Sequence, residues 1–226
     1  MGTITLKSVV EQVQRTLQDE GAGVQWPQGE LLHYANQTYK DIADKDPSLY
    51  TRTANFTLAA GAEQVAPSDC TRIIKPISNM GTAGATPGKT VFWQPYEDFV
   101  RFKPDFRNDS SDTEIKYFLQ PEGERKYYYC YPPASATTYV RVNYEAIPSD
   151  GTINGVNGGS SDSVIPFDNT KMTMLWAGIL RLAFSKEGAD GNSMFADKYD
   201  GLFNREFQID MAVDRVTKSK RLGEDD

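Results

Sequence analysis

The spacing of apolar residues changes twice along this chain, and these two changes constrain its fold more than any other feature. In the first 50 residues and again after residue 164, apolar residues recur every three or four positions, which indicates helices. Between residues 51 and 148 they alternate with polar residues, which is typical of half-buried strands. The order of helices, strands and helices predicts an α+β protein rather than a wound parallel sheet.

The outer segments predict a discontinuous helical bundle domain, residues 1–50 and 164–213, with two N-terminal and two C-terminal helices. The first helix follows an apolar stripe from Leu6 to Leu17, and the second begins at Pro27, which a first helical turn tolerates. The two C-terminal helices carry their apolar faces over residues 172–183 and 195–207.

The middle segment predicts an inserted antiparallel β-domain, residues 51–148. Strands are expected near residues 54–58, 70–75, 115–119, 126–131 and 139–144, with one short helix at 94–102. The glycine-rich residues 81–88 and 149–163 consist largely of turn formers and are expected to be flexible loops. Residues 214–226 are basic and then acidic without an apolar face, which predicts a flexible C-terminal tail.

Composition argues against several classes of function. Lys and Arg total 24 against 31 Asp and Glu, so the formal net charge is −7. This balance argues against a dedicated nucleic-acid binder and against docking to anionic lipid. No apolar stretch approaches the roughly 18 residues of a membrane span. The first residues do not follow a signal-peptide pattern, so the chain is expected in the host cytoplasm when it is made.

The residues that most often carry chemistry give no enzymatic signature. The only histidine, His33, is expected on a helix surface, because no nucleophile motif accompanies it. Cys70 and Cys130 do not have metal-ligand spacing and are expected as buried small hydrophobic residues. The acidic residues between 105 and 114 miss the calcium-loop spacing and suit a solvated loop. The sequence thus predicts no catalytic residue, no metal and no cofactor, and leaves a structural role by elimination.

A run of tyrosines suggests an interaction surface. Tyr127, Tyr129 and Tyr131 belong to a strand in which five successive side chains are aromatic or thiol. A platform for stacking nucleic-acid bases would need more basic residues around it than this segment supplies. We therefore expect these tyrosines, together with the loop at 81–88, to contact a neighbouring subunit.

Several short motifs, in order along nearly the whole chain, resemble one protein family. The first 48 residues contain an apolar helix ending near Leu17-Gln18-Asp19, a Trp, and a second helix bearing Glu30-Leu31-Leu32 and Asn36. Further motifs are Ala66-Pro67-Ser68-Asp69-Cys70-Thr71-Arg72-Ile73, Tyr131-Pro132-Pro133, Val140-Arg141-Val142-Asn143-Tyr144, Ile165-Pro166-Phe167-Asp168, Leu175-Trp176-Ala177 and Ala196-Asp197-Lys198-Tyr199. In these motifs the chain resembles the head-to-tail adaptor (connector) proteins of tailed bacteriophages, especially short-tailed ones.

The resemblance implies a structural virion protein at the head–tail junction. Such adaptors form a dodecameric ring below the portal protein, extend the DNA channel and attach the tail nozzle or tube, without a cofactor or a substrate. It also implies that Tyr127, Tyr129 and Tyr131 contact a neighbouring subunit or the nozzle. An acidic wall would repel DNA phosphates and let the genome slide through the lumen without specific binding.

The resemblance also points to the portal as the partner of the C-terminal tail. Lys218, Lys220 and Arg221 are expected to meet acidic portal groups, and Leu222 to enter an apolar notch. The tail would then become ordered on binding; the alternative is a frayed terminus without a role. Two other functions stay open: another tail or head-completion part, such as a nozzle, tail-tube or stopper protein, and a cell-wall hydrolase.

Overall fold

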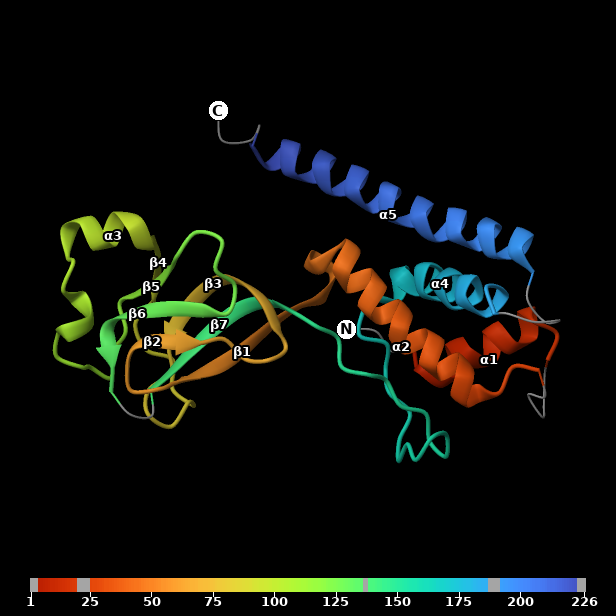
Figure 1. Cartoon of the computed structure of the whole chain (residues 1–226), viewed down its shortest axis with the longest axis horizontal. Helices are drawn as coiled ribbons and strands as arrows, with labels where there is room; N and C mark the ends of the chain where they lie inside the picture. Colours follow the sequence, from red (N-terminus) through yellow and green to blue (C-terminus); the bar gives the residue numbers. More distant parts are fainter. Residues whose placement is uncertain (1–3, 20–24, 136–137, 187–191, 223–226) are drawn as a thin grey trace. The chain divides into compact units, whose positions relative to one another are not determined.

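The computed structural model describes residues 4–19, 25–135, 138–186 and 192–222, with the backbone alone for residues 209–222. The chain contains both helices and β-sheets (Figure 1), and the prediction of an α+β protein is confirmed. By its contacts the chain divides into two units, one of Met1–Leu49 with Pro148–Asp226 and one of Tyr50–Ile147. We call them the helical unit and the β unit.

The helical unit contains the four helices that the apolar periodicity predicts. They are α1 (Leu6–Thr16), α2 (Gln28–Lys45), α4 (Met172–Phe184) and α5 (Ser193–Leu222), with short 3-10 helices η1 (Pro47–Tyr50) at its border and η3 (Asn169–Lys171) before α4. The side chain of Thr5 caps α1 by accepting a hydrogen bond from the Ser8 amide at 3.3 Å. Pro27 lies at the N-cap of α2.

Helix α4 lies at the centre of the helical unit. Leu175, Ile179 and Leu180 are fully buried, and the helix packs against α2 and α5. Gly178 permits the close approach to both neighbours. A Cβ at this position would lie 2.4 Å from Cγ2 of Thr38 and 3.0 Å from the ring of Phe203.

The segment at 149–163 has no helix or strand, as expected, but it is held in place rather than freely exposed. The amide of Gly151 donates to Oδ1 of Asn36 at 2.8 Å, and Nδ2 of Asn36 donates to the carbonyl of Gly151 at 3.3 Å. Ile153 is buried, and the amide of Thr152 donates to Oγ of Ser163 at 2.8 Å. These contacts are long-range, so the glycine-rich composition did not reveal them.

The C-terminal segment differs from its prediction as an unstructured tail. Helix α5 continues to Leu222, so residues 214–222 are helical, and residues 223–226 lie outside the described part of the chain. Extending a helix costs far less than nucleating one, and the segment up to Leu222 contains neither Gly nor Pro to stop it. The absence of an apolar face therefore did not indicate the absence of a helix.

The β unit consists of two sheets. One has the order β1 (Thr51–Leu58), β7 (Thr138–Ala146), β3 (Cys70–Asn79), and the other the order β2 (Gly61–Val65), β6 (Tyr127–Ala134), β5 (Tyr117–Gln120), β4 (Phe92–Pro95). The pairs are antiparallel except β4–β5, which is parallel and corrects the expectation of a purely antiparallel domain. The connection between these two strands contains α3 (Tyr96–Phe102) and η2 (Phe106–Asn108), as a parallel crossover requires.

Two buried amide side chains fix the connections of the β unit. Gln64 accepts from the amide of Ala59 at 2.8 Å and donates to its carbonyl at 2.8 Å. Asn79 accepts from the amide of Ile115 at 2.8 Å and donates to its carbonyl at 2.8 Å. Each side chain thereby supplies partners for both backbone groups of a residue outside its own strand.

Candidate functional site

Strand β6 distributes its five consecutive aromatic and thiol side chains over two faces. Tyr128 and Cys130 are buried on one face, and Tyr127, Tyr129 and Tyr131 alternate with them on the other. Only Tyr127 is widely open to solvent, with 46% of its surface exposed, whereas Tyr129 and Tyr131 are half-buried. The three candidate interface tyrosines therefore differ in what they can offer to a partner.

Tyr129 and Tyr131 have neighbours within the β unit. Helix α3 and η2 cover this face of β6, with Phe106 buried at the centre. The Tyr129 ring lies 5.1 Å from that of Tyr96, and the Tyr131 ring 5.1 Å from that of Phe99, measured between centroids. These are favourable aromatic distances. The sequence did not reveal this cover, because it depends on the parallel crossover.

Two cations extend this aromatic layer. The guanidinium of Arg107 lies 4.5 Å above the Tyr129 ring and donates to the Tyr96 hydroxyl at 2.7 Å. Lys103 donates to the Tyr131 hydroxyl at 2.6 Å and forms an ion pair with Asp109. The hydrogen bond with Asp109, followed by that with Tyr131, raises the pKa of Lys103, and the hydrogen bond from Lys103 lowers the pKa of Asp109. Both groups are therefore charged at neutral pH.

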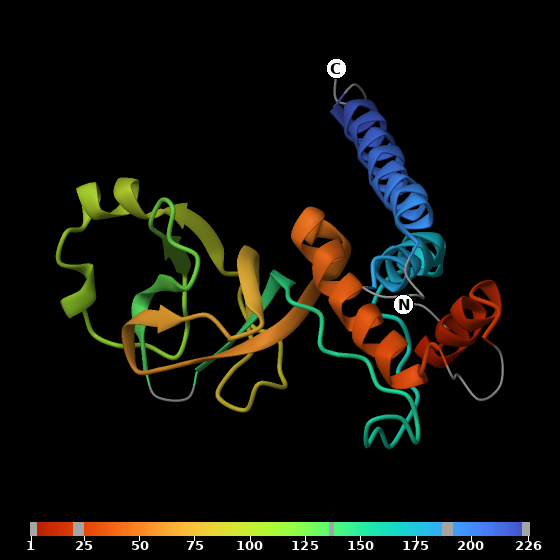
Figure 2. The same cartoon turned by 45° about the vertical axis from the view of Figure 1, so that its right-hand side comes forward.

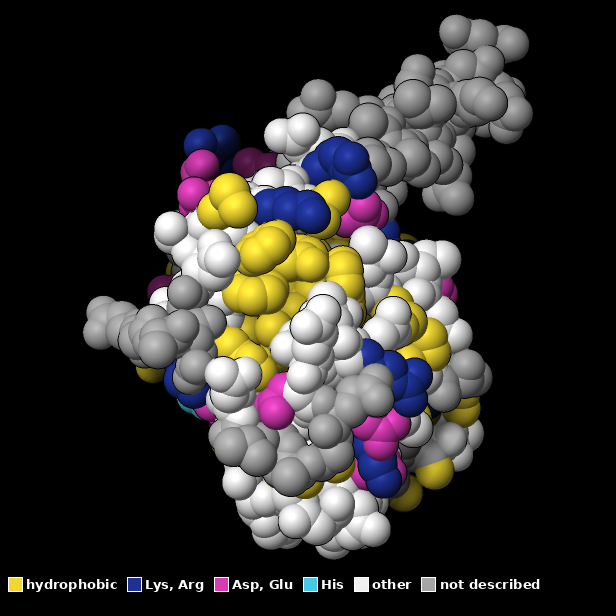
Figure 3. All heavy atoms as spheres, turned by 90° about the vertical axis from the view of Figure 1, so that its right-hand side faces the viewer, with side chains coloured by type: hydrophobic (Ala, Val, Ile, Leu, Met, Phe, Trp, Pro, Cys, Tyr) yellow, Lys and Arg dark blue, Asp and Glu magenta, His cyan; other side chains and the backbone are white. Residues whose placement is uncertain are grey.

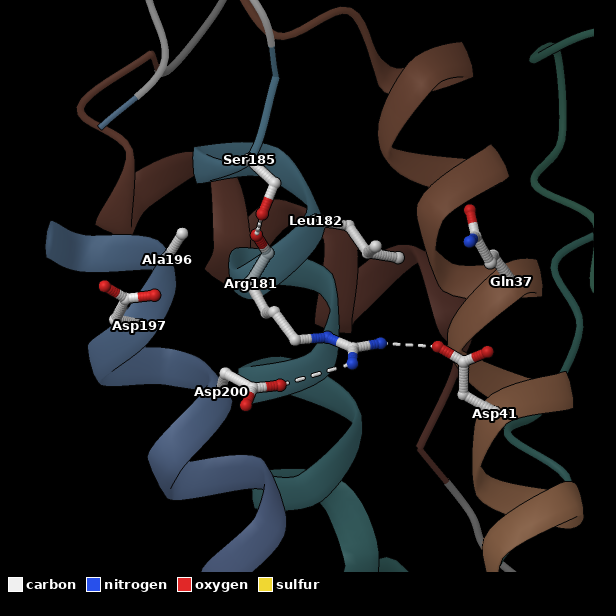
Figure 4. A pocket seen from close by; sticks show the side chains of 8 residues that line it. All are labelled: Gln37, Asp41, Arg181, Leu182, Ser185, Ala196, Asp197 and Asp200. Carbon is white, nitrogen blue, oxygen red and sulfur yellow. Dashed lines mark hydrogen bonds and ion pairs between the residues drawn. The ribbon is translucent and has the colours of Figure 1, made fainter. Parts of the chain in front are cut away.

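A groove of about 410 Å³ in the helical unit contains the ion pairs of Arg181. Figure 4 shows Arg181 of α4 between Asp41 of α2 and Asp200 of α5. Its guanidinium pairs with Asp41, lies 3.3 Å from Asp200 and lies 4.7 Å above the Phe203 ring. Its Nε is buried and has no hydrogen-bond partner among the described residues. Because a guanidinium does not release its proton near neutral pH, the arrangement joins three helices rather than moving protons.

The second groove lies in the β unit, and we call it the tyrosine groove. It has a volume of about 670 Å³ and is lined by Tyr127, Tyr129, Glu63 and residues 121–124. The carboxylate of Glu124 accepts from the amides of Lys126 and Arg125 at 3.0 and 2.9 Å, and these bonds lower its pKa. The groove thus combines aromatic faces with ionised carboxylates.

Several large apolar side chains of the β unit face solvent. Phe102, the last residue of α3, is 89% exposed, and Phe92 on β4 is 60% exposed. The spacing of apolar residues in α3 could have indicated that Phe102 is exposed. The stripe that faces the sheet contains Tyr96, Phe99 and Val100, and Phe102 falls outside it.

The helical unit also has hydrophobic side chains at its surface. Figure 3 shows hydrophobic side chains gathered on one face. Separately, Met194 and Phe195 in the first turn of α5 are exposed. The Phe195 ring lies 5.3 Å from that of Phe184, which stacks on Tyr199 at 5.6 Å. These three rings form an aromatic layer that is incompletely covered by the described residues.

The other residues singled out in the sequence have ordinary structural environments. His33 is exposed on α2, and the cysteines Cys70 and Cys130 are free and buried, as expected. Burial raises the pKa of both thiols to about 11, which makes them unreactive at neutral pH. In the acidic segment, Glu114 pairs with Lys89 at 2.8 Å, and the described residues contain no cluster suited to a metal ion.

The expected portal contacts Lys218, Lys220, Arg221 and Leu222 lie in the last turns of α5, and their side chains are outside the described part of the chain. In the described part, no helix combines the length and the apolar character needed to cross a membrane. Comparison of the sequence with family models and with curated proteins gives no match.

Proposed function

We propose that this chain is a structural virion protein, a head-to-tail adaptor that forms a ring under the portal, extends the DNA channel and attaches the tail nozzle or tube. The family motifs along the sequence support the proposal. The structural observation that carries it is the length of α5 relative to the helix on which it packs.

Helix α5 has 30 residues and α4 has 13. At 1.5 Å per residue these lengths are about 45 and 20 Å, so α5 is more than twice as long as α4. Phe207 of α5 is buried, and Figures 1 and 2 show the helix continuing beyond α4. By sequence, the extension carries Lys218, Lys220 and Arg221. A long helix with a basic C-terminal end is suited to binding a partner with an acidic surface.

The helix changes how binding to the portal would work. A disordered tail would spend part of its interaction energy on becoming ordered, whereas a helix that is already formed would not. We therefore infer that residues 214–222 dock as a helix.

We also infer that residues 1–50 and 164–213 form one discontinuous helical domain that hosts the β-domain, residues 51–148, as an insertion. The division of contacts between Leu49 and Tyr50 and between Ile147 and Pro148 supports this reading. An inserted domain interrupts its host once, so the host consists of the segments before and after it, as the helical unit does here. The negative net charge fits a channel that does not hold DNA.

The proposal is tested by electron microscopy of the purified chain mixed with the portal protein of the same phage. The expected result is a closed ring on the narrow end of the portal. A variant that ends at residue 208, before the part of α5 that we assign to the portal, is the matched control and should leave the portal bare. A full-length chain that stays monomeric and does not bind the portal would contradict the proposal.

A further inference from the structure

The β unit carries an exposed apolar and basic projection at the end of α3. Phe102 is almost fully exposed, and the side chain of the preceding Arg101 is 79% exposed. Within the described part of the chain this guanidinium pairs with Asp98 at 3.8 Å, a distance at which an exposed pair contributes little. We call Arg101 and Phe102 the α3 knob. An exposed phenylalanine beside an arginine has the chemistry of an interface anchor.

The tyrosine groove has the complementary chemistry. Its wall includes the exposed ring of Tyr127 and the half-buried ring of Tyr129, against which another aromatic ring can pack. The carboxylates of Glu63 and Glu122 are exposed at the same groove, where they can pair with a guanidinium. Their negative charge disfavours a phosphate-bearing ligand such as DNA.

The α3 knob cannot fill the groove of its own chain. The groove adjoins the first turn of α3, where the carboxylate of Glu97 accepts from the amide of Glu122 at 3.3 Å. Phe102 ends the same helix, about 8 Å further along its axis. Neither Arg101 nor Phe102 lines the groove of its own chain, and Arg101 pairs with Asp98 instead, so the knob is available to the groove of a second copy.

We propose that the α3 knob of one copy docks into the tyrosine groove of a second copy, with Phe102 against Tyr127 and Arg101 beside Glu122. The contact is head-to-tail, because it joins two different surfaces, and such contacts close into rings when the rotation between copies permits. This inference rests on the proposed function, because the contact would join neighbouring subunits of the ring. The chain carries both the positive knob residue Arg101 and the negative groove residue Glu122, and this complementarity is why we assign the groove to a second copy.

The first test is sedimentation velocity of the full-length chain without portal, over a series of protein concentrations. We expect wild type to self-associate and Phe102→Ala to weaken this association by about 30-fold, as for an interface hot spot. Phe92→Ala is the matched control, because it removes another exposed phenylalanine that lines neither surface. A wild-type chain that stays monomeric throughout, or a Phe102→Ala variant that associates like wild type, overturns the proposal.

The second test reverses charges. Arg101→Glu and Glu122→Arg should each weaken association by at least tenfold, and the double variant should recover most of the loss because the pair is restored with opposite sense. Losses that simply add in the double variant would overturn the proposed pairing. Portal binding of the same variants separates this inference from the proposed function. If every variant still forms a ring on the portal, the proposed knob contact is wrong but the proposed adaptor function is not contradicted.

Discussion

Asn36 of α2 and Gly151 exchange two hydrogen bonds, one in each direction between a side-chain amide and a backbone peptide group. Gly151 is the fourth residue after the β unit ends, and its position is close to the core. A Cβ there would lie 2.6 Å from a methyl group of Leu6 and 3.3 Å from the ring of Tyr39. This exchange thus ties the segment that returns from the β unit to both N-terminal helices.

Asn36→Ala is expected to destabilise the helical unit by about 1–3 kcal/mol, because it leaves the buried amide and carbonyl of Gly151 without partners. The free energy of unfolding, measured in urea by the helical circular dichroism signal, checks this value. Gln37→Ala, at the exposed neighbouring position, is the control and should change stability by less than about 0.5 kcal/mol. Equal stability of Asn36→Ala and wild type would show that the exchange contributes nothing.

Gly178→Ala is expected to destabilise the protein by about 1–3 kcal/mol, although alanine favours helices intrinsically. The added methyl group would overlap Thr38 and Phe203, where α4 meets α2 and α5. Gly201→Ala in α5 is the matched control, because nothing lies within 4 Å of its Cβ position. This control should stabilise the protein by up to about 1 kcal/mol. Thermal unfolding of the two variants should therefore shift in opposite directions.

The lowered pKa of the Glu30 carboxyl predicts that the stability of the protein depends on pH. Burial raises the pKa of this carboxyl, but hydrogen bonds from Tyr34 and Lys186 and the charge of Lys186 outweigh it, so that the net pKa lies below its ordinary value of 4.5. The distances are 2.7 Å from the Tyr34 hydroxyl and 3.0 Å from Nζ of Lys186. A carboxyl group whose pKa is lower in the folded than in the unfolded state stabilises the protein when the pH is above the unfolded-state pKa. This stabilisation is lost as the pH falls through the folded-state pKa.

Glu30→Gln should therefore cost up to about 1 kcal/mol of unfolding free energy near neutral pH, and the difference from wild type should shrink in the acid range. Urea unfolding at a series of pH values measures this difference. Lys186→Gln should cost little more once Glu30 has been replaced, because the pair is already broken. A deficit that stays constant down to acid pH would mean that the ionised carboxylate is not what stabilises the fold.

Tyr129→Ala and Tyr127→Ala are expected to act on different properties. Tyr129 packs against Tyr96 and Phe106, so its removal should cost about 1–3 kcal/mol of stability. Tyr127 is exposed, so its removal should leave stability within about 0.5 kcal/mol and weaken assembly instead. Unfolding and sedimentation measured on both variants check the distinction. Assembly that neither substitution changes would argue that both tyrosines serve only internal packing.

Deletion of residues 217–226 is expected to leave the domain folded and to weaken portal binding. The circular dichroism signal should fall only by the lost turns of α5, because the deletion begins ten residues after the buried Phe207. Replacement of Lys218, Lys220 and Arg221 by Gln tests charge alone and should weaken binding more at low salt than at high salt. Undiminished affinity of the truncated chain at physiological salt would make this end of α5 dispensable.

The sequence predicted the parts of the fold that depend on local periodicity. The apolar stripe from Leu6 to Val13 and the alternation through Phe56 each repeat over two or more turns or pleats, so helix and strand could be distinguished. Strands β2 and β4 have only 5 and 4 residues, too few for a period to stand out.

The contacts that depend on tertiary structure could not be predicted. Gln64 and Asn79 read as ordinary polar strand residues, yet both are buried and bond backbone groups outside their own strands, Gln64 at Ala59 and Asn79 at Ile115. The same limit applies to the candidate site. The tyrosines of β6 were visible as a cluster, but which of them stays exposed is decided by α3, through the parallel pairing of β4 and β5.

We propose that this chain forms the ring between portal and tail, and cryo-electron microscopy of the intact head–tail junction of the phage is the decisive measurement. We expect a dodecameric ring of this chain below the portal, with α5 against the portal and the α3 knob of each copy in the tyrosine groove of its neighbour. A junction in which another protein occupies that ring, with this chain elsewhere or missing, would show that the chain is not the adaptor.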